Sequence, residues 1–177
     1  VKSVDNLFDG AAEVFVDDDV IDDFYNGTDI LLEQQKQKLF PNHYLLLKSD
    51  KDEKKTAICR FLNYDTPLRK IYSYKDIWGL TANNKEQKYA MDLLFDKNVH
   101  IISLTGQAGT GKTLIAAACG LEQVLNSTKS QGGYDKLIIT RPVQPMGRDI
   151  GFLPGTLEEK MMPWIAPLRD NLEYLFG

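Results

Sequence analysis

The chain has 177 residues, of which 43% are hydrophobic and 26% are charged, and its formal net charge is −4. This length suits one ordinary domain or two small ones, and the composition is that of a soluble globular protein. No apolar run approaches the length of a membrane span and the first residues show no signal-peptide pattern, so we expect a cytoplasmic protein without membrane contact. In a reducing cytosol the two cysteines, Cys59 and Cys119, would be buried thiols.

Charge is spread unevenly along the chain. Residues 1–29 hold nine acidic residues against Lys2 alone and sum to −8, so the remaining residues carry +4 of the total of −4. A mildly basic body is compatible with a nucleic-acid partner but does not demand one. The first residue is Val1 rather than methionine, which suggests a piece cut from something longer.

The first predicted elements are a short strand and a short helix. Ala12, Val14 and Val16 alternate with Glu13 and Phe15, which indicates a strand. An acidic cluster then surrounds the start of a helix that ends near residues 26–27, and its members are Asp17, Asp18, Asp19, Asp22 and Asp23. Carboxylates suit a helix N-terminus, which favours a solvated cap. A metal site is the alternative, but the spacing lacks the glycine of a calcium loop.

Residues 28–76 are predicted to form a small β region with strands at 43–48, 56–62 and 68–72. Basic and aromatic residues are interleaved along it: Lys48, Lys51, Lys54, Lys55, Arg60, Arg69, Lys70 and Lys75 with Tyr44, Phe61, Tyr64, Tyr72 and Tyr74. Positive charge and flat rings on a small sheet suit single-stranded nucleic acid. The competing interpretation, which we favour on pattern alone, is that the lysines solvate a hairpin turn while the aromatic residues fill a thin core.

A helix reaching about Phe95 follows, and Gln87 near its start has two interpretations. In helicase-type motors a glutamine upstream of the first core strand recognises adenine, because its amide can donate and accept at once. However, Asn84 and Gln87 also form a capping-box pattern, in which Gln87 caps its own helix. The two roles stay open and could be linked.

Residues 99–104 are a short apolar run rich in β-branched residues, which predicts a buried strand. The run leads into Gly-x-x-x-x-Gly-Lys-Thr, a full match to the phosphate-binding loop, and a helical pattern follows. The residues of this loop are Gly106, Gln107, Ala108, Gly109, Thr110, Gly111, Lys112 and Thr113. Strand, glycine loop and helix together are the context that the motif requires.

The chemistry of this loop follows from its backbone. Glycines let successive N–H groups point inward to form an anion nest, and the positive end of the next helix adds attraction for phosphate oxygens. Lys112 would bridge the β- and γ-phosphates, and the Thr113 hydroxyl would ligate Mg²⁺. For Gln107, Ala108 and Thr110 we expect the backbone N–H groups to matter more than the side chains.

A second buried strand is predicted at 136–140, with Arg141 directly after it on the edge where ligands bind in open α/β sheets. Arg141 would contact phosphate or a nucleic-acid backbone, or else form a structural ion pair. Residues 142–155 are too rich in proline and glycine for a regular element. A capping box at Thr156 then opens a last helix, which Pro163 should break or restart.

A motor with this loop also needs an apolar strand that ends in an acidic residue, to hold Mg²⁺ through water. Neither predicted core strand ends in this way. Only about 100 residues, from Trp78 onward, are available for the α/β part, which is short for a complete core. We therefore expect a truncated core that alone lacks what turnover requires.

One further motif follows the second strand: Thr140-Arg-Pro-Val-Gln-Pro-Met-Gly-Arg-Asp-Ile-Gly-Phe-Leu-Pro-Gly155, with Glu158-Glu-Lys160 and Pro163-Trp164 beyond it. Together with Ile77-Trp78-Gly79-Leu80, Asn84, Gln87 and the phosphate loop, it closely resembles the PhoH-like ATPase family. More weakly, the resemblance extends back to about Phe15. Such spans look like the PIN-linked members, in which a PIN ribonuclease domain is joined through a small β region to the ATPase.

The resemblance implies an α/β fold with a RecA-like, helicase-like P-loop NTPase core, here truncated and preceded by a small β region. It implies an ATP- and Mg²⁺-dependent motor acting on single-stranded RNA and coupled to a PIN ribonuclease in cis. Residues 106–113 would bind phosphate and Mg²⁺ with Lys112 and Thr113 as catalytic residues, Gln87 would read adenine, and Arg141 would belong to the substrate-side motif.

The expected organisation is an acidic lead-in at 1–27, the small β region at 28–76 and the first part of the ATPase core at 77–177. The oligomeric state is open, a homo-oligomer included. A different class of function, a non-catalytic nucleic-acid or partner-binding module centred on residues 28–76, is the alternative. A small-molecule kinase ranks last, because the sequence shows no acceptor-site signature.

Overall fold

The computed structural model describes residues 10–35, 38–72, 74, 76–126, 133–140 and 156–177, without the side chains of residues 157–165. The chain divides into two units, Val1–Tyr72 and Ser73–Gly177. Each unit has a hydrophobic core of its own. No helix in these described ranges is long and apolar enough to cross a bilayer.

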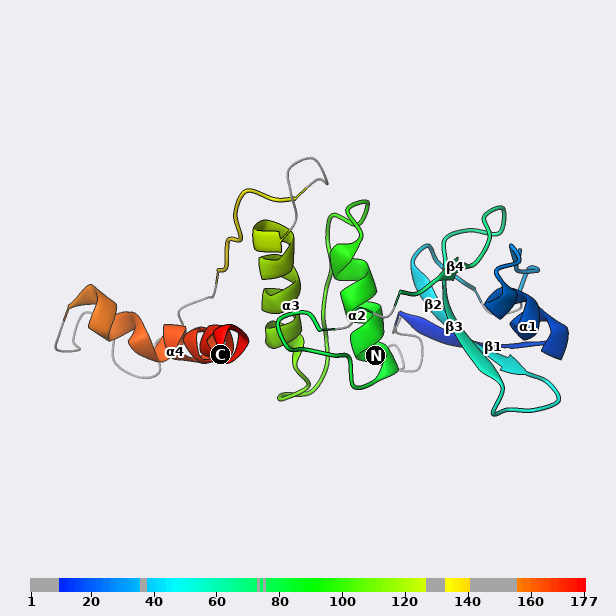
Figure 1. Ribbon diagram of the computed structural model, residues 1–177, viewed down its shortest axis with the longest axis horizontal. Helices are drawn as coiled ribbons and strands as arrows, with labels where there is room; N and C mark the ends of the chain where they lie inside the picture. The colour runs from blue at the N-terminus through cyan, green and yellow to red at the C-terminus, as the bar shows by residue number, and fades with distance from the viewer. Residues whose placement is uncertain (1–9, 36–37, 73, 75, 127–132, 141–155) are drawn as a thin grey trace, which may run out of the picture. The chain divides into compact units, whose positions relative to one another are not determined.

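The described residues of the first unit form a four-stranded sheet and one helix (Figure 1). In chain order the elements are β1 (Ala11–Val16), α1 (Asp18–Asn26), β2 (His43–Ser49), β3 (Thr56–Phe61) and β4 (Arg69–Lys70). The strands lie side by side in the order β1-β2-β3-β4. β1 and β2 run parallel because α1 and the segment after it carry the chain back, whereas the pairs β2–β3 and β3–β4 are antiparallel.

Alternation along the strands decides which face of this sheet is buried. The register places Val14 opposite Leu47 and Leu47 opposite Ala57, so their side chains share one face, and all three are buried. Ile21 and Phe24 of α1 belong to the same core cluster. The strands at 11–16, 43–49 and 56–61 and the helix at 18–26 therefore lie where the sequence predicted them.

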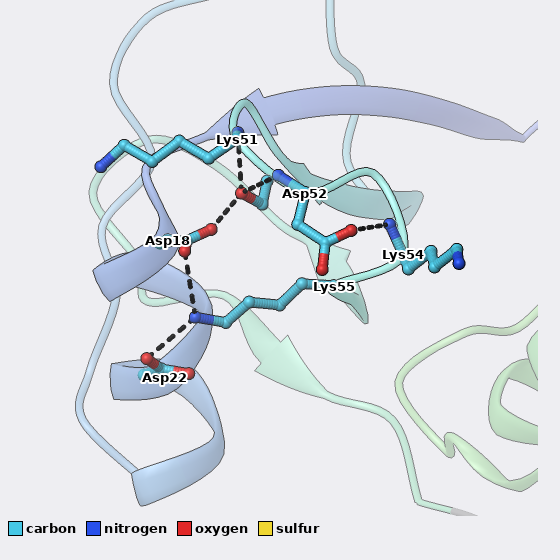
Figure 2. Close-up of polar contacts among 7 residues, drawn as sticks. Asp18, Asp22, Lys51, Asp52, Lys54 and Lys55 are labelled. Atoms are coloured by element: carbon cyan, nitrogen blue, oxygen red, sulfur yellow. Dashed lines mark hydrogen bonds and ion pairs between the residues drawn. The ribbon is translucent and has the colours of Figure 1, made fainter.

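Polar contacts fasten the loop between β2 and β3 to the start of α1 (Figure 2). The Ser49 hydroxyl donates to Asp18 and accepts from two backbone N–H groups of the loop, at 3.0 and 3.1 Å. Lys55 Nζ lies 2.9 Å from a carboxylate oxygen of Asp22 and 3.7 Å from one of Asp18. The hydrogen bond from Ser49, assisted by the Lys55 charge, lowers the pKa of Asp18, and the bond to Asp22 raises the pKa of Lys55.

These contacts bear on the acidic cluster, for which the sequence left a solvated cap and a metal site open. Asp18 and Asp19 lie in the first turn of α1, while Asp17 at the N-cap makes no side-chain capping bond. Within the described ranges, no three or more His, Cys, Asp or Glu residues are arranged to hold a metal ion. In the structure, Asp18 and Asp22 of α1 bind Ser49 and Lys55 and so hold the β2–β3 loop against this helix.

The second unit is built from helices. These are α2 (Lys85–Phe95), α3 (Lys112–Leu121), the π-helical turn η2 (Glu122–Asn126) and α4 (Leu157–Phe176). Its core consists of Ile77, Met91, Ile115, Ala117, Ala118, Cys119 and Leu175. The end of α4 reaches this core, since the rings of Trp78 and Phe176 meet edge to face with centroids 5.2 Å apart.

The buried strands predicted at 99–104 and 136–140 are not formed. Both segments run without regular secondary structure, and Ile101 and Ile138 are 91% and 69% exposed. A parallel strand is stabilised by hydrogen-bonded neighbours and by layers on both faces. Among the residues described for this unit, the single β pairing is an isolated bridge between Ile77 and Leu80. The apolar pattern alone therefore does not produce a strand here.

One smaller prediction is right only in part, and another is wrong. The third strand of the β region, expected at 68–72, consists of Arg69 and Lys70 alone. Pro163 does not interrupt the last helix, which runs from Leu157 to Phe176. A proline removes one backbone donor, and the turns on either side continue the helix across that gap.

Candidate nucleotide-binding site

The loop at residues 106–113 leads directly into the N-terminus of α3. Gly109 and Gly111 have φ values of 79° and 83°, in the left-handed region that glycine adopts without strain. Gly111 is the N-cap residue of α3, so the second of these glycines leads directly into the helix. Residues 106–110 and Thr113 are exposed, while Gly111 and Lys112 are half-buried. The loop is therefore open to a ligand along most of its length.

The N-terminus of α3 has no side-chain cap, because its N-cap residue is Gly111. The first intrahelical bond runs from the Ile115 N–H to the Gly111 carbonyl, at 2.9 Å. The N–H groups of Lys112, Thr113 and Leu114 have no acceptor within the helix, since they precede the first full turn. Uncapped amides at the positive end of a helix dipole attract anions.

Lys112 is folded back over the loop that precedes it. Its Nζ donates to the carbonyl oxygens of Gly106 at 3.0 Å and Gln107 at 2.6 Å, and to Thr110 Oγ1 at 3.2 Å. The charged ammonium is therefore held at the centre of the loop by uncharged acceptors. A phosphate oxygen is a stronger acceptor for an ammonium group than a carbonyl is, so this geometry fits a phosphate group.

The Thr110 side chain takes part in the loop as well. Its Oγ1 donates to the Gln107 carbonyl at 2.9 Å and accepts from Lys112. A Cβ added at Gly106 would lie 3.4 Å from this oxygen, so the loop closes tightly there. The sequence motif predicted a role for the backbone N–H of Thr110 alone, whereas the Thr110 hydroxyl also bridges Gln107 and Lys112.

Gln87 contacts this loop from the start of α2. Its backbone N–H donates to Asn84 Oδ1 at 2.8 Å, which is the N-cap bond that the sequence pattern predicted. Its Oε1 accepts from the Asn83 N–H at 2.8 Å, and its Nε2 donates to the Thr110 carbonyl at 3.3 Å. The structure thus brings Gln87 next to the phosphate loop and shows its capping role.

The remaining predicted site residues stand as follows. Gln107 and Ala108 are exposed within the loop, and the Thr113 hydroxyl lies on the exposed first turn of α3, where it could ligate a metal ion. Arg141 and the loop at 142–155 lie outside the described residues. Their expected place beside the nucleotide stays a prediction.

Four of the basic residues of the β region have side-chain partners within the first unit. Lys48 pairs with Glu13 at 2.7 Å, Lys55 binds α1, and the buried Arg60 donates from Nε to Asn42 Oδ1 at 3.1 Å. Lys70 lies over the Tyr25 ring, 5.8 Å from its centroid. These contacts support the structural interpretation for these four basic residues, and Tyr44 and Phe61 are buried, whereas Tyr72 is 65% exposed and does not fill a core.

An open glycine loop, an uncapped helix N-terminus and a lysine folded over the loop define a P-loop nucleotide-binding protein. A family model described as "PhoH-like protein" matches residues 79–177. The chain belongs to the PhoH family, a family of P-loop ATPases. This confirms the resemblance seen in the sequence and the α/β P-loop fold class.

Three relatives illustrate the similarity. The chain is 37% identical to Protein PhoH2 of Bacillus subtilis over 175 residues, which is 98% of this chain and 39% of that protein. It is 42% identical to Protein PhoH2 of Mycolicibacterium smegmatis over 57% of this chain and 22% of that protein. It is 36% identical to Protein PhoH of Escherichia coli K12 over 58% of this chain and 27% of that protein. The chain thus spans less than half the length of these relatives, and no solved structure matches it.

Proposed function

We propose that this chain binds ATP with Mg²⁺ through residues 106–113, as the nucleotide-binding part of a PhoH-family ATPase. The observation that carries the proposal is the position of Lys112, whose ammonium group is held over an open loop at an uncapped helix N-terminus. An ammonium group and several inward-facing amides form a pocket of positive potential for a triphosphate.

Each residue has a defined task in this proposal. The amides at the start of α3 hold phosphate oxygens, and Lys112 exchanges its carbonyl acceptors for the β- and γ-phosphates. The Thr113 hydroxyl would hold Mg²⁺, and a bound magnesium ion supplies neutralisation of the charge on the phosphates. Lys112 and Thr113 thus remain the proposed catalytic residues.

The finer proposal concerns the whole protein. We propose a helicase-like motor that acts on single-stranded RNA in the cytoplasm and is coupled to a PIN ribonuclease domain in cis. Its support is the resemblance of residues 140–155 to the PhoH-like ATPase family, in which Arg141 would belong to the substrate-side motif, together with alignment to PhoH2 of Bacillus subtilis over 98% of this chain. The alternative, a binding module centred on residues 28–76, has weaker support because Lys48, Lys55 and Arg60 already have structural partners.

Calorimetric titration of the chain with Mg-ATP tests nucleotide binding. Lys112→Ala removes the ammonium group, and we expect the affinity to fall about tenfold to a hundredfold, as for other hydrogen bonds to charged groups. Lys97→Ala, in the turn after α2, removes the same charge and should bind as the unmodified chain does. Equal binding by the Lys112 variant and the unmodified chain would refute the assignment of the phosphate loop.

Turnover is a separate measurement. Because no predicted core strand in this sequence ends in an acidic residue, we expect the chain alone to release little or no phosphate from ATP. A phosphate-release assay with Lys112→Ala as the background measures this. Robust hydrolysis that disappears in that variant would show that another acidic residue of this chain holds Mg²⁺, in place of one at the end of a core strand.

A further inference from the structure

The side-chain amide of Gln87 bridges two segments of the second unit. Its oxygen accepts from the Asn83 N–H just before α2, at 2.8 Å. Its nitrogen donates to the carbonyl of Thr110, which lies 23 residues further along the chain within the phosphate loop. A Cβ added at Gly111 would lie 3.5 Å from the same nitrogen, so Gln87 also packs against the loop backbone.

The orientation of this amide is determined by its partners. Turning it over would place Nε2 against the Asn83 N–H, two donors together, and Oε1 against the Thr110 carbonyl, two acceptors together. Both ends of the carboxamide are therefore used in the orientation seen. The amide keeps one further N–H and one further lone pair, so a base edge would have to be read by an amide whose orientation is already fixed by its bonds to Asn83 and Thr110.

Through Thr110, the contact of Gln87 connects α2 to the ammonium group of Lys112. Gln87 holds the carbonyl of Thr110, and the hydroxyl of the same residue accepts from Lys112 Nζ at 3.2 Å. That hydroxyl also donates to the carbonyl of Gln107, three residues earlier in the loop. The backbone around Thr110 thus connects the start of α2 with the ammonium group that would meet phosphate.

We propose that Gln87 is a positioning residue of the phosphate loop, which fixes the Thr110 peptide for triphosphate binding rather than reading the adenine base. The inference rests on the proposed function, because it assigns Gln87 to the same nucleotide site. It has a clear consequence. Loss of the Gln87 side chain weakens the binding of every triphosphate by the same factor, whether or not the ligand carries a base.

The binding test uses three probes on the full chain: Mg-ATP, Mg-GTP and Mg-tripolyphosphate, which has no base. For Gln87→Ala we expect each affinity to fall about threefold to tenfold, the effect of one lost hydrogen bond, with an unchanged ratio of ATP to GTP. Asn84→Ala is the matched control, since it removes the N-cap bond of α2 and leaves the contact to Thr110 in place. This control should lower thermal stability without changing any of the three affinities.

A loss confined to ATP in the Gln87 variant would overturn the proposal and restore adenine reading. Unchanged affinities for all three probes would also overturn it, and so would an equal loss in Asn84→Ala, which would indicate helix capping alone. Failure of the proposed function has a different signature: the unmodified chain and Lys112→Ala would then bind all three probes equally or not at all.

A second measurement needs no nucleotide. Hydrogen exchange of the loop at residues 106–113 should be faster in Gln87→Ala than in the unmodified chain. Gln87→Glu keeps the acceptor for the Asn83 N–H but cannot donate to Thr110, so it should accelerate exchange in the loop and not at the start of α2. Unchanged loop exchange in both variants would overturn the proposal, whatever the nucleotide titrations show.

Discussion

Lys112 donates from Nζ to the carbonyl oxygen of Gln107 across 2.6 Å, so the cation of the phosphate loop already has acceptors before any nucleotide binds. Binding of a triphosphate is then an exchange of neutral acceptors for charged ones. Charge-assisted hydrogen bonds are about twice as strong as neutral ones. Because the Lys112 side chain is already ordered over the loop, binding an anion costs little further side-chain entropy.

Thr113 should decide the contribution of magnesium. Thr113→Val keeps the shape of the side chain but removes the hydroxyl, so we expect Mg²⁺ to improve ATP binding much less, by about tenfold relative to the unmodified chain. Titrations with ATP in Mg²⁺ and in chelator measure the difference. Thr113→Ser retains the hydroxyl and should behave normally; if both variants responded to Mg²⁺ alike, Thr113 would not be a ligand.

Gly111 should be intolerant of a side chain. Its φ of 83° means that Gly111→Ala introduces left-handed strain of about 1–2 kcal/mol and lowers the free energy of unfolding accordingly. Gly79→Ala is the matched control, since its φ is 74° and no atom lies within 4 Å of the added Cβ. Urea unfolding should show similar losses in both variants, whereas only Gly111→Ala should weaken ATP binding. Weaker ATP binding in both would mean that strain, not position, is responsible.

The attachment of the β2–β3 loop to α1 should depend on pH. The pKa of Asp18 is lowered in the folded state, first by the hydrogen bond from Ser49, so its contribution is complete above the unfolded pKa of about 4 and is lost as the pH falls. The pKa of Lys55 is raised, so its contribution is present below its unfolded pKa and fades at strongly alkaline pH. Urea unfolding should therefore show Ser49→Ala less stable than the unmodified chain at pH 7, with a difference that becomes smaller below about pH 4 as the Asp18 carboxylate is protonated and only the two backbone bonds to Ser49 remain.

Asp19→Asn is the control for that experiment, because Asp19 is an exposed residue of the same helix turn. It should leave the difference between neutral and acidic pH unchanged. A Ser49 variant whose stability followed that of the unmodified chain at every pH would rule out the hydrogen bond to Asp18 as a source of stability.

The two cysteines should be unreactive in the folded chain. Burial raises the pKa of Cys59 to about 12, and burial together with the charge of Glu122 raises the pKa of Cys119 to about 12. The thiolate is the reactive form, so a thiol reagent at pH 8 should modify neither until urea unfolds its unit. Mass spectrometry of peptides identifies which cysteine reacts first. Rapid labelling of one of them without urea would indicate local opening of that unit.

Local patterns predicted much of the structure. The strands at His43–Ser49 and Thr56–Phe61 follow from the pattern of apolar residues within a few positions, and the helix at Asp18–Asn26 follows from the acidic residues around its start. The N-cap bond between Asn84 and Gln87 is likewise a short-range pattern. The phosphate-binding loop could be predicted because the positions of its glycines along the chain determine the backbone conformation of residues 106–113.

What the sequence did not predict depends on distant partners. The contact of Gln87 with Thr110 joins residues far apart in the chain, and both roles considered for Gln87 agree with the same local pattern. The apolar run at 99–104 has the composition of a strand, but a strand also needs a neighbour to pair with. The part of Ser49 in holding α1 has no signature in the sequence, since a serine beside a charged turn is common.

The open apolar segments at 99–104 and 136–140 have a consequence for handling the protein. Ile101 and Ile138 face water, and the backbone around them has no strand partner in the described part of the unit. Exposed apolar segments with unpaired backbone groups associate with one another when two molecules meet. With a net charge of only −4 to keep molecules apart, added salt should promote precipitation, so dilute and low-salt buffers will favour a clear solution.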